Sequence, residues 1–359
     1  MFSSLPKLAD KAFVIAFLIP FVAFSLAVIG GFGAWPLIAA AHKALGSQKD
    51  LADLTIVAAG VWFGAVALLL LNRPLYRALE GYIGPLAAPS RVERMKVRWQ
   101  QGFDALVKAY DFAEAATDAD KDAADIAYRV ALADFRLRYP AKKERVLGTR
   151  FGNVNRAFED YPWRVYRVEG IAVWPRLSAV IPKDFQASLG DARAQVDCFV
   201  NLSVLSIVFS LLEVGQWLWS LLHLDIHGGA NICSWVVAGA LAAYKTAAWP
   251  CLGWAGGAAL FAWAAYWLML DRAIALGEQV KSAFDLYLGA LAKQLGYKLP
   301  DTLDEQERLW SALRRSYAYF EPALQDSKIK DPAPPVDAVG AAAAAEVGAA
   351  DEVADDRGD

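Results

Sequence analysis

The segment that decides the fold class is WPCLGWAGGAALFAWAAYWLML, residues 249–270. It contains no charged residue and is about as long as the roughly 20 helical residues that a bilayer core requires. Three further uncharged apolar runs occupy residues 12–41, 54–71 and 198–212, and the last continues past Glu213 to Leu222. With 57% apolar residues overall, the chain is predicted to be a polytopic membrane protein rather than a soluble one.

The number of spans depends on how the long run at 230–270, interrupted only by Lys245, is divided. A single helix of this length would be roughly twice the thickness of the bilayer core. Either Pro250 separates two spans, or only residues 249–270 cross. We favour the single crossing, because it returns the basic residues after Asp271 to the side of the N-terminus. The fold class is then all-α, with about four transmembrane helices in two pairs and a cytoplasmic helical domain.

Orientation follows from the positions of Lys and Arg beside the spans. Basic residues precede the first span and are dense after the second, at Arg73, Arg77, Arg91, Arg94, Lys96 and Arg98. The predicted location is therefore a cell (inner) membrane, crossed several times, with residues 73–197 in the cytoplasm. The predicted domains are the first transmembrane pair (1–72), the cytoplasmic helical domain (73–197), the second transmembrane region (198–270), C-terminal cytoplasmic helices (271–325) and a disordered acidic tail (326–359).

Within these domains, apolar residues at helical spacing predict a hairpin of helices over 92–116 and 120–139. A helix over 184–197 is expected to lead into the third span. Two more helices are expected over 271–320, with a break at 296–300. The tail is rich in Pro, Ala and acidic residues, a composition that cannot bury a core.

Residues 147–177, LGTRFGNVNRAFEDYPWRVYRVEGIAVWPRL, carry the densest mixture of polar and aromatic side chains. This segment resembles a group of uncharacterised bacterial membrane proteins that carry a similar FGN, EDYP and WPRL series before a span. The resemblance extends to VNLSVLSIVFSLL at 200–212 and AFDLYLGALAKQLG at 283–296, about half the chain in all. It implies a shared architecture of paired spans around a cytoplasmic domain, and it implies no activity.

Two interpretations of this segment remain open. In the functional one, Arg150, Arg156 and Arg176 form a pocket at the membrane surface for lipid phosphate or another anion. In the structural one, the polar side chains satisfy backbone groups at a turn, and we favour this interpretation. The candidate site residues are Arg150, Asn153, Asn155, Arg156, Glu159, Asp160 and Arg176, together with Glu213 in the third span.

A carboxylate at membrane depth is costly and is by default a candidate functional group. Glu213 has Gln216 on the same helix face and could serve a proton or ion path, or it could pair with Lys245 and be structural. His223, Asp225 and His227 form a second polar cluster, but two histidines and one acid make a weak metal site. Pairs of glycines spaced GxxxG, at 60 and 64 and at 253 and 257, are candidate helix-packing faces.

No phosphate-binding loop, HExxH motif or nucleophile elbow occurs in the sequence, and the three cysteines lack metal-type spacing. We therefore expect no cofactor, no metal and no nucleic-acid partner. The leading hypothesis is a non-enzymatic scaffold or regulatory component that binds a protein partner, another copy of itself or lipid head groups. The alternatives are an oligomeric channel or transporter that uses Glu213, and a lipid-acting enzyme. The acids at 159 and 160 and the histidines are predicted on opposite sides of the bilayer, which argues against a joint catalytic site.

Overall fold

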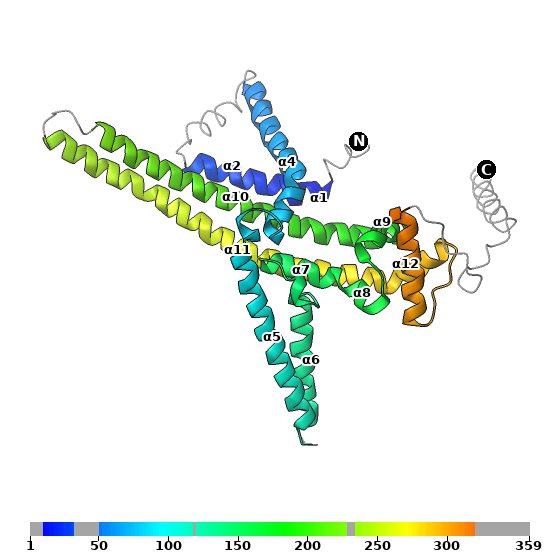
Figure 1. The fold of residues 1–359 in the computed structure, drawn as a ribbon. Coiled ribbons are helices and arrows are strands. Elements are labelled where there is room, and N and C mark those ends of the chain that lie inside the picture. Colours follow the sequence, from blue (N-terminus) through cyan, green and yellow to red (C-terminus); the bar gives the residue numbers. More distant parts are fainter. Residues whose placement is uncertain (1–9, 32–49, 118–119, 228–233, 320–359) are drawn as a thin grey trace, which may run out of the picture. The chain divides into compact units, whose positions relative to one another are not determined.

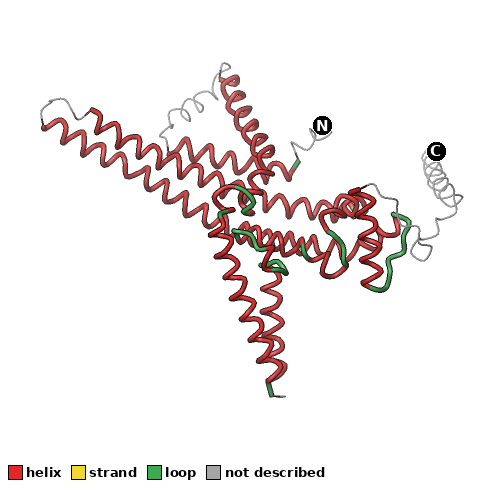
Figure 2. The backbone as a smooth tube through the Cα atoms, viewed as in Figure 1, coloured by secondary structure: helices red, strands yellow, loops and turns green. Residues whose placement is uncertain are grey.

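The computed structural model describes residues 10–31, 50–117, 120–227 and 234–319, and Figures 1 and 2 show that the regular elements in these ranges are helices. The α-helices are α1 (Lys11–Phe13), α2 (Ile19–Gly31), α4 (Asp50–Glu80), α5 (Pro89–Ala115), α6 (Lys121–Arg138), α7 (Arg150–Glu159), α8 (Tyr161–Tyr166), α9 (Gly170–Val180), α10 (Lys183–His227), α11 (Ser234–Gln294) and α12 (Leu303–Tyr319). Among the described residues there are also three short helices of other types: the π-helix η2 (Val14–Leu18) and the 3₁₀-helices η3 (Gly84–Ala87) and η4 (Lys143–Arg145). The all-α prediction is confirmed.

Four stretches of the described chain are long and apolar enough to cross a membrane: Lys11–Gly31, Val57–Ala87, Lys183–Leu218 and Pro250–Gln294. Their number agrees with the prediction of about four spans. The alternative in which Pro250 separates two spans requires a break at this proline, but α11 passes through it without interruption. The expected helix over 184–197 is confirmed as the first part of α10. The helix expected after residue 270 is a continuation of α11 and not a separate element.

The chain divides into two compact units, residues 1–158 with 183–280, and residues 159–182 with 281–359. In the first unit, α2 packs along α10, and the π-helix η2, which precedes α2, also contacts α10. Pro20 has no N–H to donate to the carbonyl of Ala16, four residues earlier, and the π-helix η2 lies at this point. The buried amide of Asn201, on α10, donates to the Ala16 carbonyl at 2.8 Å. The Ala16 carbonyl, which Pro20 leaves without its usual helical donor, therefore receives a hydrogen bond from Asn201 of α10.

A second polar contact joins α4 to α10. The hydroxyl of Tyr76 donates to Asp197 Oδ1 at 2.6 Å, and the amide of Asn72 donates to the same oxygen at 3.4 Å. Apolar side chains surround this contact in a cluster that also includes α7 and α11, namely Leu79, Phe151, Val154, Val196, Val200, Met269, Leu270 and Ala273. The cluster holds the C-terminal part of α4, the start of α7 and the middle of α10 and α11 against one another.

The predicted helical hairpin is confirmed as α5 and α6, which lie side by side in Figure 1. Trp99 of α5 stacks on Phe103 at 5.1 Å between ring centroids and meets Phe135 of α6 edge-on at 5.6 Å. The indole N–H of Trp99 donates to the carbonyl of Pro140 at 3.0 Å. These contacts fix the base of the hairpin beside the loop that leads into α7.

The second unit contains α8, α9, α12 and the C-terminal part of α11. Leu309, Trp310 and Leu313 of α12 are buried, and Arg314 pairs with Glu169 at 3.1 Å. The predicted break at 296–300 is confirmed: α11 ends at Gln294, and Gly296 adopts a positive φ of 79°. The predicted disordered tail lies outside the described residues.

Candidate functional site

The start of α7 is fixed by a buried amide. Asn153 is 0% exposed, and its side chain accepts a hydrogen bond from Leu147 N–H at 2.7 Å and donates to the carbonyls of Leu147 and Thr149 at 3.1 and 2.8 Å. The hydroxyl of Thr149 accepts from Gly152 N–H and donates to the carbonyl of Glu80, both at 3.0 Å. Asn153 thus satisfies backbone groups of a tight loop, which is the role that the structural interpretation gives it.

Asn155 and Arg156 contact the end of α4 from the same helix. The Asn155 amide donates to Glu80 Oε1 at 2.7 Å, and the guanidinium of Arg156 lies 5.3 Å from the ring centroid of Tyr82. These contacts, like those of Thr149, bind α7 to the residues where the second apolar helix ends. They place both side chains in packing and positioning roles.

Three of the candidate residues, Glu159, Asp160 and Arg176, belong to the second unit. Asp160 is buried where α8 begins. The guanidinium of Arg176 lies 3.4 Å from the ring centroid of Tyr317 and donates to the carbonyl of Ala172 at 3.3 Å. Burial raises the pKa of Tyr317. Arg150, Arg156 and Arg176 each lie over a different aromatic ring, and Arg176 is in a different unit from the other two.

Two tyrosines of the second unit share one carboxylate. The hydroxyls of Tyr161 and Tyr166 donate to Asp285 Oδ1 at 2.7 and 2.8 Å. Desolvation by burial and then the hydrogen bond to Asp285 raise the pKa of Tyr166 to about 12, and the same causes raise the pKa of Tyr161. A raised pKa means that the folded state favours the neutral phenol. The stability that these groups contribute is therefore present below about pH 10 and is lost as the pH rises towards 12.

We expect the substitution Asp285→Asn to lower the pKa of Tyr166 towards the ordinary value of about 10. Ultraviolet titration of tyrosinate, compared with the Tyr166→Phe protein, measures this shift. The control is Asp301→Asn, which removes an exposed acid from the same unit. Equal titration curves for the Asp285→Asn and parent proteins would show that the Asp285 carboxylate does not raise the pKa of Tyr166.

A groove in the first unit brings together three arginines, of which only Arg150 was predicted as a site residue. Arg91 and Arg98 of α5 and Arg150 at the start of α7 line it, together with Tyr266 and residues of α10 and α11. Its volume is about 560 Å³. Arg91 and Arg98 are seven residues apart and so lie on the same face of α5. That spacing was visible in the sequence, where these residues served only to orient the spans.

The groove is basic on one side and apolar on the other. All three arginines are exposed, and none of them forms a salt bridge with a carboxylate of the described residues. The opposite wall consists of residues of α10 and α11 from the apolar stretches, which include Ile207, Leu211, Ala259, Trp263 and Trp267. The Arg150 guanidinium lies 4.7 Å from the ring centroid of Trp267, a cation–π contact. An amphiphilic anion matches this combination of surfaces.

Glu213 lies elsewhere in the first unit, where α2, α10 and α11 meet. Its side chain is 0% exposed, and its two oxygens have no full hydrogen-bond partner among the described residues, since the nearby thiol of Cys251 is a weak donor. Gly31 of α2 approaches so closely that a Cβ at that position would collide with Glu213 Oε1. The side chains of Lys245, His223, Asp225 and His227, and the whole of His42, lie outside the described part of the structure.

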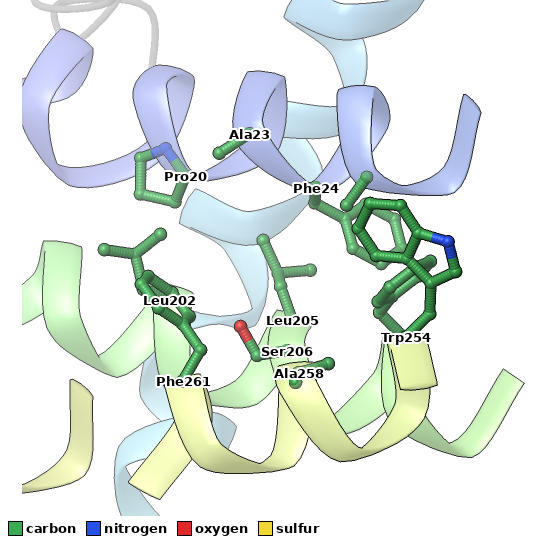
Figure 3. Close-up of a pocket in the computed structure, with 12 residues that line it drawn as sticks. Pro20, Ala23, Phe24, Leu202, Leu205, Ser206, Trp254, Ala258 and Phe261 are labelled. Carbon is green, nitrogen blue, oxygen red and sulfur yellow. The ribbon is translucent and has the colours of Figure 1, made fainter. Parts of the chain in front are cut away.

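An apolar cavity of about 340 Å³ lies one turn from Glu213. Figure 3 shows Pro20, Ala23 and Phe24 of α2 facing Leu202 and Leu205 of α10 and Phe261 of α11. Of the predicted GxxxG faces, Gly64 is used within the chain, because the ring of Phe21 occupies the space of its missing side chain. Gly60, Gly253 and Gly257 have no such neighbour within 4 Å among the described atoms.

The described residues thus offer two arrangements that could bind a ligand: a basic and apolar groove suited to an amphiphilic anion, and the buried carboxyl of Glu213. Neither contains the nucleophile, base and oxyanion donors of a hydrolytic site within the described chain. Within the same residues, no cluster of His, Cys, Asp and Glu could hold a metal ion. Comparisons of the chain with protein families, with curated proteins and with solved structures find no match.

Proposed function

We propose that this protein is a non-enzymatic, multi-pass protein of a cell (inner) membrane whose cytoplasmic helical domain binds the head groups of anionic phospholipids. The observation that carries the proposal is the groove formed by Arg91, Arg98 and Arg150 against the apolar wall of α10 and α11. Of the partners expected from the sequence, lipid head groups fit this groove best. The lipid supplies an acyl chain for the apolar wall and a phosphate for the arginines.

The arginines suit a phosphate for a geometric reason. The planar guanidinium presents parallel N–H donors that match phosphate oxygens two at a time, and it stays charged at every physiological pH. Because no described acid neutralises the three arginines, their field is available to a ligand. Arg91 follows four residues after the stretch Val57–Ala87, so it lies close to the end of this apolar stretch.

The aromatic residues support a position at the membrane surface. Trp263 and Trp267 are exposed and belong to the last apolar stretch. Indole rings favour the head-group region, because they are apolar with one polar edge. The excess of Lys and Arg after the second apolar helix favours the cytoplasmic side for this surface. A phospholipid bound there would have its chain beside Ile207 and Leu211 and its phosphate beside the arginines.

The proposal is tested by replacing Arg91, Arg98 and Arg150 with Gln together. Each basic residue near an anionic membrane surface contributes about 1 kcal/mol, so we expect the triple variant to bind phosphatidylglycerol about a hundredfold more weakly at low salt. Native mass spectrometry of the protein in neutral detergent counts the bound lipids directly. Phosphatidylcholine binding should fall less, because its head group has no net negative charge.

The matched control replaces Lys108, Lys121 and Arg129 with Gln, which removes the same charge from exposed positions of the α5–α6 hairpin outside the groove. This control should bind phosphatidylglycerol within twofold of the parent protein. Equal losses in the two triple variants would show that net charge, and not the groove, binds the lipid. Unchanged binding in the groove variant would refute the proposal.

A further inference from the structure

The buried carboxyl of Glu213 suggests a second function that is independent of lipid binding. In an apolar stretch long enough to cross a membrane, a carboxylate without partners carries a large desolvation penalty. Such a group therefore needs a counter-charge, which can be a cationic side chain, a bound metal cation or a proton. The groups that surround Glu213 indicate which of these three counter-charges it has.

Described side chains supply no counter-charge. The described part of the first span, Lys11–Gly31, carries a charge only at Lys11, at its far end, and Lys11 pairs with Asp191 at 2.7 Å. On α11, the titratable group beside Glu213 is the thiol of Cys251. On the packed elements, the charged side chains that lie outside the described part of the structure are those of Lys245 on α11 and of Asp50 and Asp53 on α4, and on α10 itself those of His223, Asp225 and His227. The other charged residues of α4 and α11 lie at Arg73 or later and at Asp271 or later.

The oxygen atoms around Glu213 favour a proton over a metal cation. A Na⁺, Mg²⁺ or Ca²⁺ ion takes about six oxygen ligands. The unpartnered oxygens of the described residues here are the two of Glu213 and Oε1 of Gln216, three residues later on the same helix face. A proton needs only one oxygen to carry it and one to accept its hydrogen bond. The buried Oε1 of Gln216 is an acceptor without a donor.

We propose that the Glu213 carboxyl is a proton-binding site inside the bundle formed by α2, α10 and α11. In the protonated state, the carboxyl O–H donates to the Gln216 amide oxygen, and a neutral side chain lies against Gly31. Loss of the proton leaves a negative charge in contact with the Gly31 backbone, which requires water or a cation to enter between α2 and α10. Proton binding is thereby linked to the packing of α2.

Infrared spectroscopy of the reconstituted full-length protein tests this site directly. A protonated carboxyl has a C=O stretching band that the carboxylate lacks, and the spectrum of the parent minus that of Glu213→Gln isolates the band of this residue. We expect the band at pH 7 with at least about nine-tenths of its intensity at pH 5. An ordinary glutamate, with a pKa of about 4.3, would keep less than about one per cent of its proton at pH 7.

A second variant tests the acceptor. Replacing Gln216 with Leu removes the acceptor oxygen, and the Glu213 band should shift to the higher frequency of a carboxyl without a hydrogen bond. Absence of the pH 7 band in the parent protein would overturn the proposal, because Glu213 would then be ionised and paired with a cation such as Lys245. A band of equal size in the Glu213→Gln protein would assign the proton to another residue and would also overturn it.

Discussion

Replacing Gly152 with valine is expected to destabilise the first unit strongly. Gly152 lies in the first turn of α7, and a Cβ at this position would collide with the backbone carbonyl of Glu80 at the end of α4. A backbone atom cannot move aside as a flexible side chain can, so α7 must shift away from α4. That shift would break the hydrogen bond from Thr149 to the Glu80 carbonyl and the hydrogen bond from Asn155 to the Glu80 side chain.

The expected loss is about 3 kcal/mol or more, the upper end of what overpacking costs. Thermal unfolding in detergent, followed by tryptophan fluorescence, measures it. The matched control is Gly190→Val, since Gly190 is an exposed helical glycine of α10 with no atom within 4 Å of a Cβ. A Gly152→Val protein that unfolds at the same temperature as the control would mean that α7 does not pack on α4 in this way.

Asn153→Ala is expected to have an effect of similar size for a different reason. The alanine leaves the N–H and the carbonyl of Leu147 without the partner that the amide provides, whereas the Thr149 carbonyl keeps the backbone N–H of residue 153 at 3.2 Å. Each buried backbone group without a partner costs about 1–3 kcal/mol, and partial entry of water limits the total to about 3 kcal/mol. Thermal unfolding of Gln101→Ala, at an exposed position of α5, provides the baseline, within about 0.5 kcal/mol of the parent.

Asn153→Asp distinguishes the hydrogen bonds from the volume of the side chain. An aspartate has nearly the same size but no N–H donors, so at neutral pH it places a buried negative charge against two carbonyls. We expect it to be at least as destabilising as alanine at pH 7 and to recover in part at acidic pH, where its O–H can donate to one carbonyl. An Asn153→Asp protein as stable as the parent at pH 7 would exclude the proposed role of the amide.

The elements that could be predicted from the sequence are those set by local pattern. Uncharged runs about as long as a bilayer core gave the four apolar helices, and the periodic apolar residues of 92–139 gave the α5–α6 hairpin. The path of α11 through Pro250 was less certain, because a proline in a helix interior removes one hydrogen bond and favours a break. The residues on both sides of Pro250 nevertheless continue as one helix.

The groove could be predicted only in part, because its arginines come from separate elements. Arg150 was a candidate from the composition of its segment, but Arg91 and Arg98 reach the groove only because the fold brings residues of α5 to the same pocket as residues of α7, α10 and α11. The interaction of Asn201 with the Ala16 carbonyl was missed for the same reason. A signal for it was present, since Pro20 must leave a carbonyl without its usual donor and an asparagine in an apolar run needs a polar partner.

The length of α10 has a mechanical consequence. Its 45 residues correspond to about 68 Å of unbroken helix, more than twice the thickness of a bilayer core of about 30 Å. Its first three turns carry the charged residues Lys183, Asp184, Asp191 and Arg193. Further along the helix, Asn201 contacts η2 and Glu213 contacts α2. A continuous hydrogen-bonded helix resists twisting, so a torque on its apolar part turns its charged part through nearly the same angle. Through Asp197 and Tyr76, such a rotation would also pull on α4.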